Sequence, residues 1–262
     1  MDTVSFVVFV IGVALLFLLV RSVRKKKTPA VKQTLPANYP ELLQENVLFY
    51  QKLDKEQQQE FNERVAHFVE EVRITGVKTT VTPLDMVLTA ASAVIPTFNF
   101  THWEYPNLNE VLIYPGTFSE AYELDGNNKN ILGMVGNGPM QHVMILSQSA
   151  LRLGFSNKTD KENTAIHEFV HLLDKADGAV DGVPEALLKH AYVLPWIHLV
   201  HKNIAAIEKG DSDINVYGAT NEAEFLAVVA EYFFERPALL QQKHPELYEM
   251  MNRMFRGKKV NG

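Results

Sequence analysis

The sequence contains no cysteine among its 262 residues. This absence excludes zinc sites with thiolate ligands, folds crosslinked by disulfides and catalysis by a cysteine nucleophile. A metal ion in this protein must therefore be bound by histidine, aspartate or glutamate. The absence also fits a reducing compartment, where disulfides are rare.

The sequence also lacks an excess of positive charge. Its formal net charge is -6 and its pI is about 5.9, so direct nucleic-acid binding is not expected, because such proteins carry basic surfaces. Hydrophobic residues make up 47% of the chain and charged residues 21%, which is typical of a globular domain with a substantial core. The length suits one compact catalytic domain.

One long uncharged run is present, at residues 3–20, and it is rich in Val, Leu, Phe and Ile. As a helix these eighteen residues would rise ~27 Å, about the hydrocarbon core of a bilayer. Asp2 precedes the run and five basic residues follow within residues 21–27, which places the C-terminal side in the cytoplasm. A cleaved signal peptide is the alternative, but the basic start and the small-residue cleavage site are missing. We therefore expect a single anchor in the cell inner membrane that contacts the lipid bilayer.

The most informative stretch is HEFVH at residues 167–171, an H-E-x-x-H sequence. Residues four apart lie on one face of a helix, so the imidazoles of His167 and His171 can meet at one metal ion. Glu168 is rotated away from that face and can act as a general base on the metal-bound water. The flanking residues are apolar, which indicates a buried helix whose ionisable groups need partners. The alternative is a helix with two ordinary histidines and a surface glutamate.

A second stretch, residues 217–234, offers a third ligand. It begins with a turn and continues as an apolar helix in which Glu224 and Glu231, seven residues apart, share a face. A glutamate facing inward from such a helix needs a partner, and it would complete a His₂Glu zinc site. Asp174, at the end of the HEFVH helix, is a rival ligand, an orienting partner for a histidine or a helix-end carboxylate. Tyr217, in the turn, either stabilises a developing oxyanion or packs.

The two blocks HEFVHLLD and YGATNEAEFLAVVAEYFFERP resemble the Mlc titration factor A family of bacterial zinc metallopeptidases. They are also similar to the catalytic domain of anthrax lethal factor, a gluzincin-type protease. Lethal factor has an acidic residue four positions after its ligand glutamate, where this chain has Val228, so we expect Asp174 or Glu231 to orient a zinc-binding histidine instead. The resemblance implies one zinc ion per chain, with metal ligands His167, His171 and Glu224 and catalytic residues Glu168 and Tyr217.

The function that this resemblance implies is zinc-dependent hydrolysis of a peptide or protein substrate. A zinc-activated water would attack the peptide bond, with Glu168 as general base. The same resemblance implies an alternative: a regulatory protein that binds and sequesters a transcriptional repressor, with catalysis secondary.

The expected fold is α+β and mostly helical, with a small sheet beside the HEFVH helix and one transmembrane helix before the domain. Strands are expected at residues 111–114 and 142–147, the second as an edge strand where a substrate can pair, or as a plain structural strand. Glycines near residue 133 indicate a flexible loop, and residues 185–207 a long helix. The chain divides into an anchor (1–21), a basic, proline-containing linker (22–39), a metallopeptidase domain (40–256) and a tail (257–262).

Overall fold

The structure is a computed structural model, and it describes residues 33–100, 103–118, 131–135, 142–157 and 159–256. The predicted anchor at residues 1–21 and the predicted tail at residues 257–262 lie outside the described residues. Within the described part of the chain, no helix is long and apolar enough to span a membrane.

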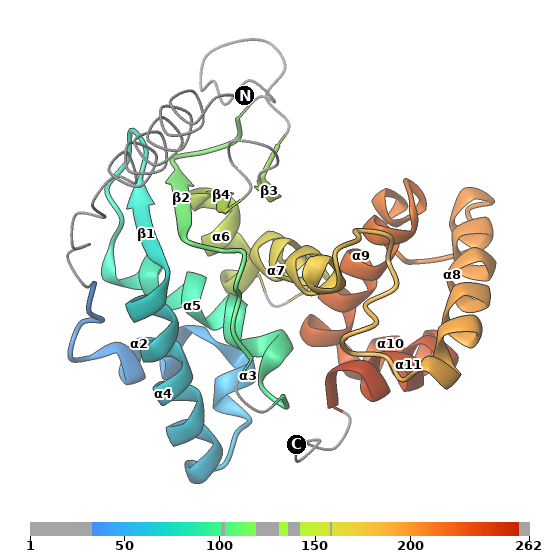
Figure 1. The fold of residues 1–262 in the computed structure, drawn as a ribbon, viewed down its shortest axis with the longest axis horizontal. Coiled ribbons are helices and arrows are strands. Elements are labelled where there is room, and N and C mark those ends of the chain that lie inside the picture. The colour runs from blue at the N-terminus through green and yellow to red at the C-terminus, as the bar shows by residue number, and fades with distance from the viewer. Residues whose placement is uncertain (1–32, 101–102, 119–130, 136–141, 158, 257–262) are drawn as a thin grey trace, which may run out of the picture. The chain divides into compact units, whose positions relative to one another are not determined.

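The described part of the chain forms a mostly helical α+β domain (Figure 1), as expected. The helices are α2 (Tyr39–Asn46), α3 (Leu48–Gln51), α4 (Lys55–Glu71), α5 (Pro83–Thr97), α6 (Gln148–Ser156), α7 (Thr164–Asp174), α8 (Val193–Glu208), α9 (Glu222–Glu235), α10 (Pro237–Lys243) and α11 (Pro245–Arg256). Short 3₁₀ turns are η2 (Lys175–Asp177), η3 (His190–Tyr192) and η4 (Val216–Ala219).

A small mixed sheet completes the domain. Its strands are β1 (Arg73–Gly76), β2 (Glu110–Tyr114), β3 (Gly133–Val135) and β4 (Val143–Ser147), in the order β1-β2-β4-β3. Strands β1, β2 and β4 run parallel to one another, and β3 pairs antiparallel with β4. Helix α7 packs against both β3 and β4, so the sheet lies beside the HEFVH helix as expected.

Local capping fixes where several helices begin. Asp54 and Gln57 cap α4 reciprocally, with hydrogen bonds of 2.9 and 3.1 Å between each side chain and the other's backbone N–H, as the sequence predicts. Thr82 and Asp85 form the same arrangement at the start of α5. Each cap satisfies backbone N–H groups that would otherwise lack partners.

The two helices that carry the motif blocks pack directly on each other. Helix α7 contacts α9 and α5, and nearly all of its residues are buried. Its Phe169 packs on two aromatic rings from other elements, with ring centroids 5.6 Å from Phe68 and 5.2 Å from Tyr105. Helix α9 is buried from Phe225 to Phe233. The motif helices therefore lie in the core, and four of their ionisable residues have little access to water, namely His167, Glu168, Asp174 and Glu231.

One prediction about the sheet is wrong, and the structure decides between two alternatives that the sequence left open. Gly133 does not lie in a loop, because residues 133–135 form strand β3 at the edge of the sheet. The strand predicted at residues 142–147 exists as β4, but it is not an edge strand, since β2 and β3 pair with its two sides. The order of strands depends on pairings between distant segments, which local patterns do not encode.

The predicted start of the long helix at residues 185–207 is also wrong. Helix α8 begins only at Val193, after the 3₁₀ turn η3. Pro195 explains the position, because proline has no N–H and is tolerated only in the first turn of a helix.

Candidate metal centre

Helix α7 positions two histidines on one face. Its N-cap is Asn163, whose side-chain oxygen accepts the backbone N–H of Ile166 at 3.2 Å. His167 and His171 follow one turn apart, with ring centroids separated by 4.7 Å. The apolar remainder of the helix is buried, which fixes the direction in which both imidazoles point.

Helix α9 brings a carboxylate to the same point. The capping oxygen of Asn221 accepts the backbone N–H of Glu224 at 2.9 Å, which sets Glu224 in the first turn of α9. Its Oε2 lies 2.9 Å from Nε2 of His167 and 3.4 Å from Nε2 of His171, and the two Nε2 atoms are 3.1 Å apart. Three potential ligand atoms therefore converge from two helices, and they form a group that could hold a metal ion.

The dimensions of this group fit a small divalent cation. A tetrahedral zinc site with ligand distances of ~2.0–2.1 Å separates its ligand atoms by roughly 3.4 Å. The three observed separations, 2.9, 3.1 and 3.4 Å, are close to that value. Two imidazole nitrogens and one carboxylate oxygen are also ligands that zinc accepts at catalytic sites.

The charges around the group favour a cation as well. Burial alone would lower the pKa of His167, but its hydrogen bonds to Glu224 and Glu231 outweigh burial and raise the pKa to about 10. Burial alone would raise the pKa of Glu224, but the two histidines lower it to about 2. Buried carboxylates need a positive partner, and a metal ion supplies one.

Glu231 contacts the other ring nitrogen of His167. Its Oε1 lies 2.7 Å from Nδ1 of His167, and its Oε2 accepts the backbone N–H of Asn163. The two acceptor contacts fix the carboxylate, which in turn fixes the imidazole and directs Nε2 toward Glu224. Of the two carboxylates predicted to orient a histidine, Glu231 is thus the one placed against His167.

Asp174 lies elsewhere in the same helix and is not one of the three convergent residues. Its Oδ2 accepts the backbone N–H of Gly182 at 2.8 Å, and burial raises its pKa to about 6 although that hydrogen bond lowers it. Its Oδ1 and the Nδ1 of His171 are both buried without a hydrogen-bond partner among the described residues. Asp174 therefore anchors the loop after α7 and interacts with His171 through its charge.

Gly182 is a supporting residue that sequence reasoning missed. Its φ is +75°, and an added Cβ would lie 2.3 Å from the backbone oxygen of Glu222. Its carbonyl accepts the indole N–H of Trp196 at 2.6 Å. The close approach joins the loop after α7 to the start of α9, two residues before Glu224. The Asp-Gly pair at residues 181–182 was the available signal, because such pairs mark tight turns.

Glu168 is directed away from the histidine pair and toward the sheet. It is 6% exposed, and burial raises its pKa, while the positive charges of the nearby histidines oppose that shift. Gly133 in β3 lies directly against it, since an added Cβ would be 2.6 Å from Cγ of Glu168. The absence of a side chain at Gly133 therefore leaves the space that Glu168 occupies, which the sequence alone did not reveal.

Tyr217 lies at the open side of the group. It is in η4, where the side chain of Asn215 accepts its backbone N–H at 2.9 Å, and it is 52% exposed. Its ring centroid is 6.0 Å from that of His167. Partial burial raises the pKa of its phenol, as do the charges of Glu224 and Glu168. The phenol therefore stays protonated and can donate a hydrogen bond next to the convergent group.

Comparison with known proteins agrees with this geometry. A family model described as glucose-regulated metallo-peptidase M90 matches residues 20–256. An uncharacterized protein of Synechocystis sp. is 27% identical over 243 residues, which cover 86% of this chain and 85% of that protein. Proteins named Mlc titration factor A are 31% identical in Serratia proteamaculans and 28% identical in Edwardsiella ictaluri. These two matches cover 56% and 67% of this chain, and 60% and 70% of the relatives. The predicted resemblance is confirmed.

Proposed function

The chain belongs to the M90 family of glucose-regulated metallopeptidases, and on that premise we propose that it hydrolyses peptide bonds with one zinc ion per chain. The observation that carries this proposal is the convergence of His167, His171 and Glu224, which are the residues that would hold the ion. Bound there, zinc would polarise the scissile carbonyl and lower the pKa of a water molecule to ~7.

Glu168 acts as the general base in this proposal. It follows the first ligand directly in α7, and the charges of both histidines act on its carboxylate. It would accept a proton from the attacking water and later return that proton to the leaving amine nitrogen. Its burial supports this role, because the raised pKa brings the carboxyl nearer to the pH at which the protein works.

Tyr217 is the proposed donor to the developing oxyanion. Its phenol is protonated and half exposed beside His167, so a substrate carbonyl can approach it. A hydrogen bond made only in the transition state lowers kcat when it is removed and leaves KM nearly unchanged. Tyr217→Phe should therefore reduce kcat, and an unchanged kcat would assign Tyr217 a packing role.

Strand β3 is the proposed docking edge for an extended substrate. It is the last strand of the sheet, and one of its sides pairs with β4. Just before β3, Ile131 is bridged to Phe118. Along residues 133–135, an extended peptide can add to the side that does not face β4 through main-chain hydrogen bonds. Because Gly133 of this strand lies against Glu168, a peptide aligned there would pass close to the general base.

The decisive experiment compares wild type with Glu168→Gln. Zinc content by elemental analysis should be about one per chain in both proteins, while turnover of a peptide library should fall by ~10²–10⁴ in the variant. The exposed Glu222→Gln at the start of α9 is a matched control and should change neither quantity. A wild-type protein that neither contains nor binds zinc would refute the metal site, and an active Glu168→Gln variant would place the base elsewhere.

A second candidate function follows from the relatives named Mlc titration factor A. By analogy this chain would bind and sequester a transcriptional repressor. The complete set of ligands and the buried Glu168 support catalysis as the primary activity, because a pure binding protein needs neither. A pull-down with Glu168→Gln separates the two: a partner that binds the inactive variant as tightly as wild type shows binding independent of catalysis.

The membrane anchor stays a prediction, and we propose it as part of the function. The uncharged residues 3–20 and the basic residues 21–27 support a single span with the catalytic domain in the cytoplasm. Cell fractionation should find the full chain with the inner membrane, and protease added to spheroplasts should leave the domain intact. Recovery in the soluble fraction, or cleavage of the domain, would contradict this arrangement.

A further inference from the structure

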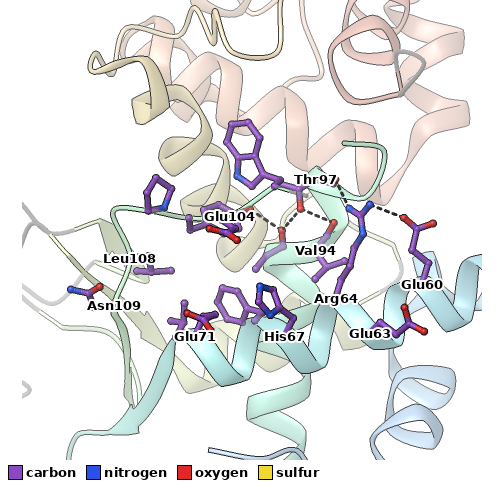
Figure 2. Close-up of a pocket in the computed structure, with 16 residues that line it drawn as sticks. Glu60, Glu63, Arg64, His67, Glu71, Val94, Thr97, Glu104, Leu108 and Asn109 are labelled. Atoms are coloured by element: carbon purple, nitrogen blue, oxygen red, sulfur yellow. Dashed lines mark hydrogen bonds and ion pairs between the residues drawn. The ribbon is translucent and has the colours of Figure 1, made fainter. Parts of the chain in front are cut away.

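A cavity of about 580 Å³ lies between α4, the C-terminal half of α5 and residues 103–109 (Figure 2). Its volume falls within the range of sites that hold small organic ligands. None of its lining residues belongs to the candidate metal centre, so the proposed peptidase activity leaves it without a role.

The polar wall of this cavity is mostly acidic. Four glutamates line it, namely Glu60, Glu63, Glu71 and Glu104. The arginine in the wall, Arg64, is already engaged, because it pairs with Glu60 at 2.6 Å and donates to a backbone carbonyl at 3.0 Å. Glu71 and Glu104 are exposed at the rim and have no ion-pair partner among the described residues. Figure 2 shows them on opposite sides of the open space.

The floor is aromatic. Tyr105 lies between two other rings, with centroids 6.2 Å from Phe68 and 6.5 Å from Trp103. The hydroxyl of Tyr105 is satisfied, since it donates to the backbone oxygen of Ala93 at 2.7 Å. Aromatic faces attract cations, so this floor suits the apolar body of a positively charged ligand.

We propose that this cavity binds a small organic cation that carries a protonated amine on an apolar or aromatic body. The amine would lie between the carboxylates of Glu71 and Glu104. The body would pack on Tyr105 and Phe68. The two parts of the ligand match the two properties of the wall, its negative charge and its apolar surface.

Titration calorimetry of the full-length chain tests the proposal with three probes that share a phenol ring. Tyramine carries an amine, tyrosol a neutral hydroxyl, and 3-(4-hydroxyphenyl)propionate a carboxylate. A chelator is present throughout, so that no amine can bind a metal ion. Tyramine should bind once per chain with a Kd on the order of 1–10 mM, as expected for a ligand of this size. Tyrosol should bind several-fold more weakly, and the anion should not bind detectably.

Two variants locate the binding. The double variant Glu71→Gln/Glu104→Gln should weaken tyramine roughly 3–10-fold and leave tyrosol nearly unchanged, because it removes only the charges. The double variant Glu208→Gln/Glu249→Gln makes the same charge change at exposed positions of α8 and α11 and should bind like wild type. The proposal is overturned if tyramine shows no saturable binding, if all three probes bind equally, or if the charge-removing variants in the cavity and on α8 and α11 weaken tyramine alike.

Discussion

Replacing Glu231 by glutamine should weaken zinc binding without removing a metal ligand. The carboxylate lies 2.7 Å from Nδ1 of His167 and is held by the backbone N–H of Asn163. Glutamine has nearly the same shape, and its one oxygen can still accept from Nδ1. Its NH2 group then cannot accept the backbone N–H of Asn163, and the negative charge that makes the imidazole a stronger ligand is lost.

The magnitude follows from the position of Glu231 behind the ligand. Loss of such a partner typically costs ~10–100-fold in metal affinity, which is roughly 1.4–2.7 kcal/mol. Glu224→Ala removes a proposed ligand atom and should abolish zinc retention altogether. The two effects differ enough to distinguish a ligand from a residue that orients one.

Glu235→Gln is the matched control for this experiment. Glu235 lies one turn beyond Glu231 on the same helix and accepts the side-chain N–H of Asn163 at 2.9 Å, but it makes no contact with His167. Burial raises its pKa to about 7, so at neutral pH the replacement removes only part of a negative charge. Its zinc affinity should equal that of wild type.

The assay is competition for zinc between each purified protein and a chromophoric chelator at constant pH. Thermal melting of the metal-free proteins shows whether a variant is folded before zinc is added. Wild-type affinity in Glu231→Gln would refute the orienting role. Equal losses in Glu231→Gln and Glu235→Gln would show that the effect comes from the packing of α9.

Three further outcomes are expected. Gly133→Ala should reduce peptidase turnover more than zinc content, because the new Cβ would displace Glu168; equal turnover in both proteins would contradict the contact. Gly182→Ala should lower the Tm, since a positive φ and a contact of 2.3 Å with the oxygen of Glu222 together cost more than ~1 kcal/mol. Asp213→Asn should also lower the Tm near neutral pH: a histidine and two lysines depress the pKa of Asp213 against the opposing effect of burial. The stabilisation by the ionised Asp213 is fully present above the unfolded-state pKa of ~3.9. The difference in Tm between wild type and Asp213→Asn should therefore shrink below that pH. A difference in Tm that stays constant with pH would refute the ion-pair account.

The sequence by itself determined the local parts of the site. The separation of four residues between His167 and His171 requires a shared face in any α-helix, and the apolar neighbours require burial. Side chains that cap α4 and α5 act within three residues, so those helix starts were predictable. Glu224 was predictable because its block has a recognisable family pattern, and the structure brings it to the two histidines.

Only the tertiary structure decided the parts that depend on distant segments. The sequence spacing allows either Asp174 or Glu231 to contact His167. Which of the two does so depends on how α9 packs on α7. The role of Gly133 depends on β3 being the edge strand, which follows from β4 lying between β2 and β3 and pairing with the distant β2. Such pairings are selected by the packing of the whole domain, whereas helical spacing and caps are fixed by bonds within a few residues.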